Sequence, residues 1–183
     1  MAVLPIPPIL SVDEYLNSSY RPDMEYVDGV LVERGMPTIA HGLLQIILGS
    51  YLRTYRKQFR FVALTEVRTQ IVERARYRIP DVMLCPRPLP IGKVMTSVPW
   101  AVIEILSPDD KVPEQLGRFR DYKRIGVSHV VLLDPEQLVA YRFEDGSLLR
   151  TQFTSLDLPS GSLPFDTTAL FQQLEEELNE GLD

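Results

Sequence analysis

Two acidic residues stand in apolar segments where a negative charge is costly. Asp81 lies within Arg78-Ile79-Pro80-Asp81-Val82-Met83-Leu84, and Glu104 lies within Ala101-Val102-Ile103-Glu104-Ile105-Leu106. Both segments read as β-strands that are adjacent in a sheet, and a buried carboxylate without compensation costs several kcal/mol. Such a pair therefore requires a cation, a proton or a good set of hydrogen bonds. Mg²⁺ fits this requirement because it takes one or two carboxylates, a carbonyl and waters, and leaves positions for phosphate oxygens.

An alternative explains the two carboxylates without a metal. Each would lie at the end of a strand and pair with an arginine such as Arg68 or Arg78. Residue types and spacing alone leave both interpretations open.

Composition describes an ordinary globular chain of 183 residues, long enough for one domain over 1–183. The net charge of −6 comes from the end of the chain, which carries six acids and no Lys or Arg from Asp166 onward. The rest is neutral, so charge does not exclude a nucleic-acid partner. A single cysteine, Cys85, indicates a reducing compartment, and MAVLPIPPIL resembles neither a signal peptide nor a membrane span. We therefore expect a cytoplasmic protein without a membrane partner.

Local signals in the first third of the chain predict two helices and a hairpin. Ser11 and Glu14 have capping-box spacing, which begins a helix at Ser11. Asp28-Gly29 joins strand-like runs at 24–27 and 30–33 into a hairpin. An apolar stripe predicts a helix over 41–57. Four basic residues, Arg53, Arg56, Lys57 and Arg60, share a face at its end, either as solvated cations at the negative helix terminus or as phosphate contacts.

The rest of the chain alternates strands and helices. Strands are predicted over 61–72, 78–84, 98–106 and 129–133, with a second hairpin from 138–143 and 148–153. Helices are predicted over 112–125, ended by Gly126, and in an acidic C-terminal segment over about 167–180; Ser107, Asp109 and Asp110 are expected to cap the helix over 112–125. These elements predict an α/β (α+β) fold with a central mixed β-sheet flanked by helices and an N-terminal hairpin.

Several motifs resemble a known family. Pro80-Asp81 followed by Glu104-Ile105-Leu106 resembles the signature of the PD-(D/E)XK nuclease superfamily, in which Asp and Glu on neighbouring strands hold a metal. From about Val12 to Phe171 the chain is similar to the Uma-type restriction endonucleases, which are widespread in bacteria. The segments that carry this similarity are Met24-Glu25-Tyr26-Val27-Asp28-Gly29, His41, Glu104-Ile105-Leu106-Ser107-Pro108, Tyr122, Gly126-Val127 and Leu132-Leu133-Asp134-Pro135. The resemblance implies a restriction-endonuclease-like fold.

The resemblance also implies a metal site. Mg²⁺ or Mn²⁺ would be held by Asp81, Glu104 and the Ile105 carbonyl. Glu25 would be a third catalytic acid near the metal, with an exposed strand residue as its alternative. The expected substrate-binding residues are His41, whose alternative is a hydrogen bond at the helix terminus, and Arg78.

One position departs from the superfamily signature. Leu106 stands where the signature has lysine, and in Uma-type relatives that lysine lies on the following helix, one turn before the tyrosine. Arg118 holds this place and becomes the fourth catalytic candidate. Because arginine stays protonated, it can stabilise charge on a phosphate but cannot take a proton from water. Lys111 and Lys123 are the nearest substitutes.

Three functions remain open at this point. The first is a Mg²⁺-dependent endonuclease that hydrolyses DNA phosphodiester bonds, for which cutting both strands favours a homodimer. The second is a nuclease-fold module that binds nucleic acid or a protein without turnover because of the lysine change. The third is a structural dimerisation protein in which the two acids serve only packing.

Overall fold

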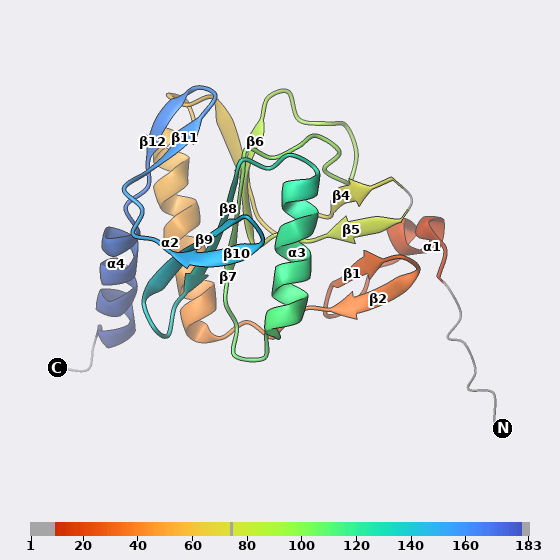
Figure 1. The fold of residues 1–183 in the computed structure, drawn as a ribbon, viewed down its shortest axis with the longest axis horizontal. Coiled ribbons are helices and arrows are strands. Elements are labelled where there is room, and N and C mark those ends of the chain that lie inside the picture. The colour runs from red at the N-terminus through yellow and green to blue at the C-terminus, as the bar shows by residue number, and fades with distance from the viewer. Residues whose placement is uncertain (1–9, 74, 181–183) are drawn as a thin grey trace.

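The computed structural model of the chain describes residues 10–73 and 75–180. These residues form three sheets and four helices. Figure 1 shows how the sheets and helices are arranged. The prediction that the N-terminus is not a signal peptide rests mostly on residues 1–9, which lie outside the described residues. The helices are α1 Val12–Asn17, α2 Ile39–Tyr55, α3 Val112–Arg124 and α4 Thr167–Asn179. The strands are β1 Met24–Val27, β2 Val30–Glu33, β3 Phe61–Leu64, β4 Thr69–Val72, β5 Arg76–Arg78, β6 Val82–Pro86, β7 Ala101–Ile105, β8 His129–Asp134, β9 Val139–Glu144, β10 Ser147–Arg150, β11 Ser155–Leu158 and β12 Gly161–Pro164.

The predicted local signals appear where the sequence places them. The Ser11–Glu14 capping box opens α1. Asp28 and Gly29 both have positive φ, 51° and 92°, which closes the β1–β2 hairpin with the twist that two-residue turns favour. Gly126 adopts φ 95° directly after the C-cap of α3, so the helix ends there as predicted.

The central sheet has six strands in the order β10-β9-β8-β7-β6-β3 and is mixed, as predicted. β7 and β8 are parallel because α3 crosses between them, whereas the other neighbours are antiparallel. In Figure 1, α3 covers the near face of this sheet and α2 lies behind it. The sheet is therefore buried on both faces, which accounts for its continuous apolar strands.

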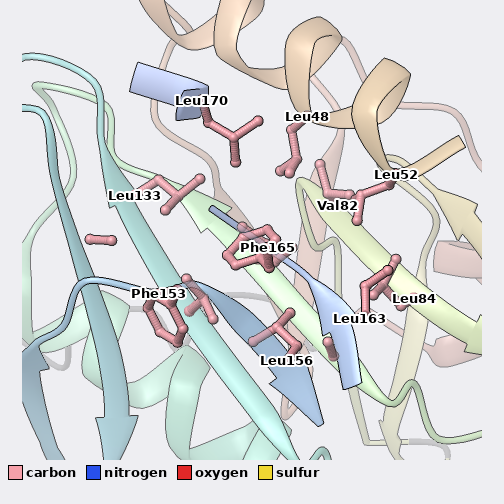
Figure 2. Close-up of a cluster of buried hydrophobic side chains, with 14 of the residues drawn as sticks. Leu48, Leu52, Val82, Leu84, Leu133, Phe153, Leu156, Leu163, Phe165 and Leu170 are labelled. Carbon is pink, nitrogen blue, oxygen red and sulfur yellow. The ribbon is translucent and has the colours of Figure 1, made fainter. Parts of the chain in front are cut away.

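Alternate residues of the central strands enter two separate cores. Val82, Leu84 and Ile103 pack with α2, α4, β11 and β12, whereas Met83 and Val102 pack with Phe119 and Tyr122 of α3. Figure 2 shows the first core, in which Phe165 lies between Leu48 and Leu52 of α2 on one side and Phe153 on the other. Strand alternation thus assigns each residue a layer.

Two predicted strands are each divided between sheets, which corrects the sequence-based boundaries. The segment over 61–72 forms β3 in the central sheet and β4 in a four-stranded sheet ordered β2-β1-β5-β4, because Glu66 between them adopts φ 54°. The segment over 78–84 divides into β5 and β6 at Pro80, which has no N–H for a ladder. Asp81 therefore lies at the passage from one sheet to the other rather than inside a strand.

Further differences lie near the C-terminus. The second hairpin ends at Arg150, and the β11–β12 hairpin that follows is not marked by an alternation strong enough to predict it. The acidic terminal helix is present as α4, capped by Asp166, and packs against α2. Over the described residues, no helix is long and apolar enough to cross a membrane.

Candidate metal and phosphate site

The Asp81 and Glu104 carboxylates lie side by side at the junction of the two sheets. The Ile105 N–H donates to Asp81 Oδ2 at 2.8 Å, and the Asp81 N–H lies 3.4 Å from Glu104 Oε2. Asp81 is 3% exposed and Glu104 1% exposed. The charge of Asp81 also acts on Glu104, so the two acids belong to one buried cluster, which joint coordination of one cation requires.

Arg34, which follows β2, supplies the nearest positive charge. Its Nη2 donates to Asp81 Oδ1, and its Nη1 lies 3.7 Å from Glu66 Oε1. Burial lowers the pKa of Arg34, but the nearby Asp81 and Glu104 outweigh burial and leave the pKa raised. Sequence reasoning missed Arg34 because a lone arginine after a hairpin carries no local signal. The metal-free alternative pairs the acids with Arg68 or Arg78. Asp81 does pair with an arginine, but this arginine is Arg34, and Arg68 pairs with Asp23 instead.

Glu104 is held by Tyr122 on α3, whose hydroxyl donates to Glu104 Oε1 at 2.6 Å. Burial, and then the charge of Asp81, raise the pKa of Glu104 to about 8. Burial also raises the pKa of Asp81, against the opposing effect of Arg34. The pair thus holds more negative charge than its surroundings neutralise, so one acid keeps a proton near neutral pH when no further cation is present.

Glu25 anchors two arginines beside the carboxylate pair. It is fully buried, which rules out the exposed alternative, and accepts from Arg78 Nη1 at 2.7 Å and the Ile79 N–H at 3.0 Å. Arg118 Nε lies 3.2 Å from Glu25 Oε1. Glu25 therefore positions Arg118 from the neighbouring sheet.

Arg78 has its donors occupied, which corrects its predicted contact with substrate. Its Nε and Nη2 bind Asp121 Oδ2 at 2.8 and 2.6 Å, and its Nη1 binds Glu25. Lys111 and Lys123 do not substitute for the missing lysine either. Lys111 pairs with Glu114 on the surface, and Lys123 Nζ donates to the Ser128 carbonyl at 2.6 Å.

His41 in the first turn of α2 faces the carboxylate pair. Its Nε2 lies 3.7 Å from Asp81 Oδ1, and its Nδ1 lies 3.0 Å from Ser107 Oγ. Its backbone N–H also donates to the Thr38 cap at 3.2 Å, so the predicted helix-terminal bond is present as well. Burial, and then Arg34, lower the pKa of His41, so the ring is neutral near pH 7.

The expected capping of α3 by Ser107, Asp109 and Asp110 is wrong, because the N-cap residue of α3 is Lys111 and no side chain caps the helix. Asp110 Oδ2 instead accepts from the Ser107 N–H at 2.8 Å. A Cβ at Gly35 would lie 3.0 Å from Asp110 Oδ1 and 3.3 Å from Ser107 Cβ, so any larger residue there would press on this loop. Both residues serve the loop that surrounds the carboxylates.

These residues surround a cavity of about 40 Å³, which has room for a few water molecules. Its lining joins both sheets, α2 and α3, and includes Arg34, His41, Asp81, Ile105, Gln115 and Arg118. Gln115 is 4% exposed, and its Oε1 has no hydrogen-bond partner among the described residues. A buried acceptor without a partner at a cavity wall indicates that the cavity takes a donor such as a bound water.

A mixed sheet with paired carboxylates at a sheet junction defines a protein of the restriction-endonuclease-like nuclease fold. The chain belongs to the Uma2 family, described as "Putative restriction endonuclease", whose model matches residues 12–171.

A solved structure shares this fold. The crystal structure of a "putative nuclease belonging to DUF820" from Anabaena variabilis is 21% identical, with a TM-score of 0.75 over 90% of this chain and 99% of the other. A cryo-EM structure of a DrdV–DNA complex matches at 13% identity and a TM-score of 0.38, over 70% of this chain and 11% of the other. The comparison with curated proteins gives no match.

Proposed function

We propose that the chain is a divalent-metal-dependent endonuclease that hydrolyses DNA phosphodiester bonds. The observation that carries the proposal is the buried Asp81–Glu104 pair, in which the N–H of Ile105, next to Glu104, donates to Asp81, and Asp81 lines a cavity that Arg118 also lines. Family membership supports the same reaction class.

The donor atoms of the site suit Mg²⁺ or Mn²⁺. The two carboxylates supply oxygen ligands, which hard divalent cations prefer, and the raised pKa of Glu104 indicates negative charge that lacks a cation. The unpaired Gln115 Oε1 suits a water on such an ion. The described residues contain no cluster of three His, Cys, Asp or Glu side chains arranged for a metal, so waters would have to complete the coordination. The residues fit Mg²⁺ as a two-carboxylate site with Asp81, Glu104 and the Ile105 carbonyl as ligands.

A divalent ion held there would lower the pKa of a water and neutralise charge on a phosphate. The remaining contributions come from the chain itself. Arg118 is anchored at its Nε by Glu25, so its terminal nitrogens can bind a phosphate oxygen. The neutral His41 ring, oriented by Ser107, can exchange a proton within the cavity, which an arginine cannot do. Arg34 opposes the rise in the pKa of Asp81 that burial causes, so it favours the carboxylate form of Asp81.

Calorimetry with Mn²⁺, together with nicking of supercoiled plasmid, tests the proposal. We expect one Mn²⁺ to bind wild type, and slow nicking to depend on the metal and to stop on addition of EDTA. Equal nicking by wild type and Asp81→Asn would assign the activity to a contaminant and overturn the proposal.

A nuclease-fold module that binds without turnover is the second candidate, favoured by one observation. Among the residues that the structure describes, no lysine lines the cavity, and Arg118 takes the place that the resemblance gives to lysine. Measurable Mn²⁺ and DNA binding without cleavage, in both wild type and Arg118→Lys, would select this alternative. The homodimer that double-strand cutting requires remains a prediction for light scattering.

A further inference from the structure

A second, larger depression lies between α2 and β3, the strand at the edge of the central sheet. We call it the α2–β3 groove, defined by Arg53 and Ser50 of α2, Val62 and Leu64 of β3, and Arg87 after β6. Its volume is about 670 Å³, far larger than that of the cavity at Asp81.

The groove is positively charged although the chain is acidic overall. Three arginines line it, Arg53, Arg56 and Arg87, and none of its described lining residues is acidic. Arg53 and Arg87 are exposed, whereas Arg56 donates from Nη1 to the Arg53 carbonyl at 2.8 Å. A concentration of cations on a protein with a net charge of −6 indicates a polyanionic ligand.

The groove adjoins the candidate metal site. Gln45 lines the groove, and its Nε2 donates to the Asp81 carbonyl at 3.1 Å. Thr65 and Val82 line the groove, whereas their sequence neighbours Glu66 and Asp81 line the cavity. The groove and the cavity therefore lie on opposite sides of the same backbone, at residues 65–66 and 81–82.

The length of the groove suits a nucleic-acid strand. Gln45 and Arg53 are eight residues apart on α2, which corresponds to about 12 Å along the helix. That length equals the axial rise of about three to four nucleotides in one strand of B-form DNA. A strand with a phosphate at Asp81 would thus place its next phosphates near the arginines.

We propose that the α2–β3 groove is the track for the nucleic-acid strand, in which Arg53, Arg56 and Arg87 bind the phosphates that neighbour the cleaved one. The inference rests on the proposed function and adds to it the path of the substrate. The arginines then act as phosphate contacts, the alternative that the sequence left open for Arg53 and Arg56.

Fluorescence anisotropy with labelled 20-nucleotide single-stranded and 20-base-pair duplex DNA tests this path. The assay contains EDTA, so that binding is measured apart from cleavage. The variant is Arg53→Ala with Arg87→Ala, which leaves the Arg56 hydrogen bond in place. We expect at least a tenfold loss of affinity, and a salt dependence whose slope shrinks by about 0.7 to 0.9 for each lost phosphate contact.

Arg124→Ala is the matched control, because Arg124 is an exposed arginine in the last turn of α3, as Arg53 is in the last turn of α2. It should leave affinity and slope unchanged. DNA affinity that is absent in wild type, or unchanged in the double variant, overturns the track. Plasmid nicking by wild type that Asp81→Asn lacks would keep the endonuclease proposal standing in either case.

Light scattering tests whether a second copy of the chain, rather than DNA, occupies the α2–β3 groove. The free edge of β3 and the exposed Ile46 beside it also suit a strand from a second copy of the chain. A wild-type dimer that the double variant converts to monomer, with DNA affinity unchanged, would overturn the track and assign the groove to a subunit interface.

Discussion

Arg34 donates to the Asp81 oxygen that also faces the His41 ring, so an arginine from the N-terminal sheet lies at the position where a cation is required. The same guanidinium extends toward Glu66 on the opposite wall. A metal ion that uses Asp81 Oδ1 therefore replaces an existing ion pair rather than filling an empty space.

Arg34→Met tests this exchange. Removing one partner of a buried ion pair leaves the other charge uncompensated, so we expect a loss of about 3 kcal/mol in the free energy of unfolding in EDTA. Saturating Mn²⁺ should reduce this loss, because the ion supplies the missing charge, and the Mn²⁺ affinity should rise. Urea unfolding with and without Mn²⁺ measures both effects.

The control for that experiment is Arg68→Met, which removes a partly exposed arginine paired with Asp23. Its effect on stability should be the same in both buffers. An equal loss with and without Mn²⁺ for Arg34→Met would show that Arg34 and the metal do not compete.

Removal of a ligand should abolish metal binding. Asp81→Asn keeps the shape of the side chain but removes its charge. We expect Mn²⁺ affinity to fall more than about 100-fold, because losing only a residue that orients a ligand already costs about 10- to 100-fold. Isothermal titration measures the affinity. Asp109→Asn, an exposed carboxylate outside the cavity, should bind as wild type does. Unchanged Mn²⁺ affinity in Asp81→Asn would contradict the assigned ligand set.

The raised pKa of Glu104 predicts a pH dependence of stability in EDTA. Between the ordinary value of 4.5 and about 8, the folded protein keeps a proton on Glu104 that the unfolded chain has released. The free energy of unfolding from this group therefore falls as pH rises through that window. Glu104→Gln should reduce the slope, although Asp81 retains part of it. Urea unfolding at pH 5, 6, 7 and 8 measures the slopes, and parallel curves would argue against the shift.

Arg118→Lys should raise the rate of nicking. A positioned general base contributes roughly 10²–10⁴-fold, so even an imperfectly placed lysine should give about a tenfold gain. Single-turnover nicking with Mn²⁺ measures the rate, and Arg118→Met should fall below wild type because the phosphate contact is lost. A slower Arg118→Lys would indicate that the bond to Glu25 matters more than proton transfer.

The sequence predicts what local patterns determine. The capping box of Ser11, the turn at Asp28-Gly29 and the apolar stripe of α2 depend on neighbours within a few residues. The placement of Asp81 beside Glu104 follows from buried charge and from the resemblance. The division of 61–72 and 78–84 between sheets could not be predicted, because pairing of β4 with β5 and of β3 with β6 is set by distant segments.

The same limit explains Arg34 and Gln115. Arg34 meets Asp81 across 47 residues of sequence, and only the docking of one sheet on the other brings them together. Gln115 lies on α3 beside charged neighbours, where nothing marks its Oε1 as buried and unpaired. Glu25 resembles an exposed hairpin residue until Arg78 and Arg118 close over it.

Several ion pairs of the buried network join different structural layers: Arg34–Asp81, Arg78–Asp121 and Arg118–Glu25. Arg34 and Arg78 extend from the N-terminal sheet, whereas Asp81 and Glu104 border the central sheet and Asp121 lies on α3. If the layers separated, each would expose ionic groups that no longer balance. We therefore expect the N-terminal sheet and the central sheet to open as one cooperative unit, so that slow amide exchange in β1 requires the same opening event as in β7.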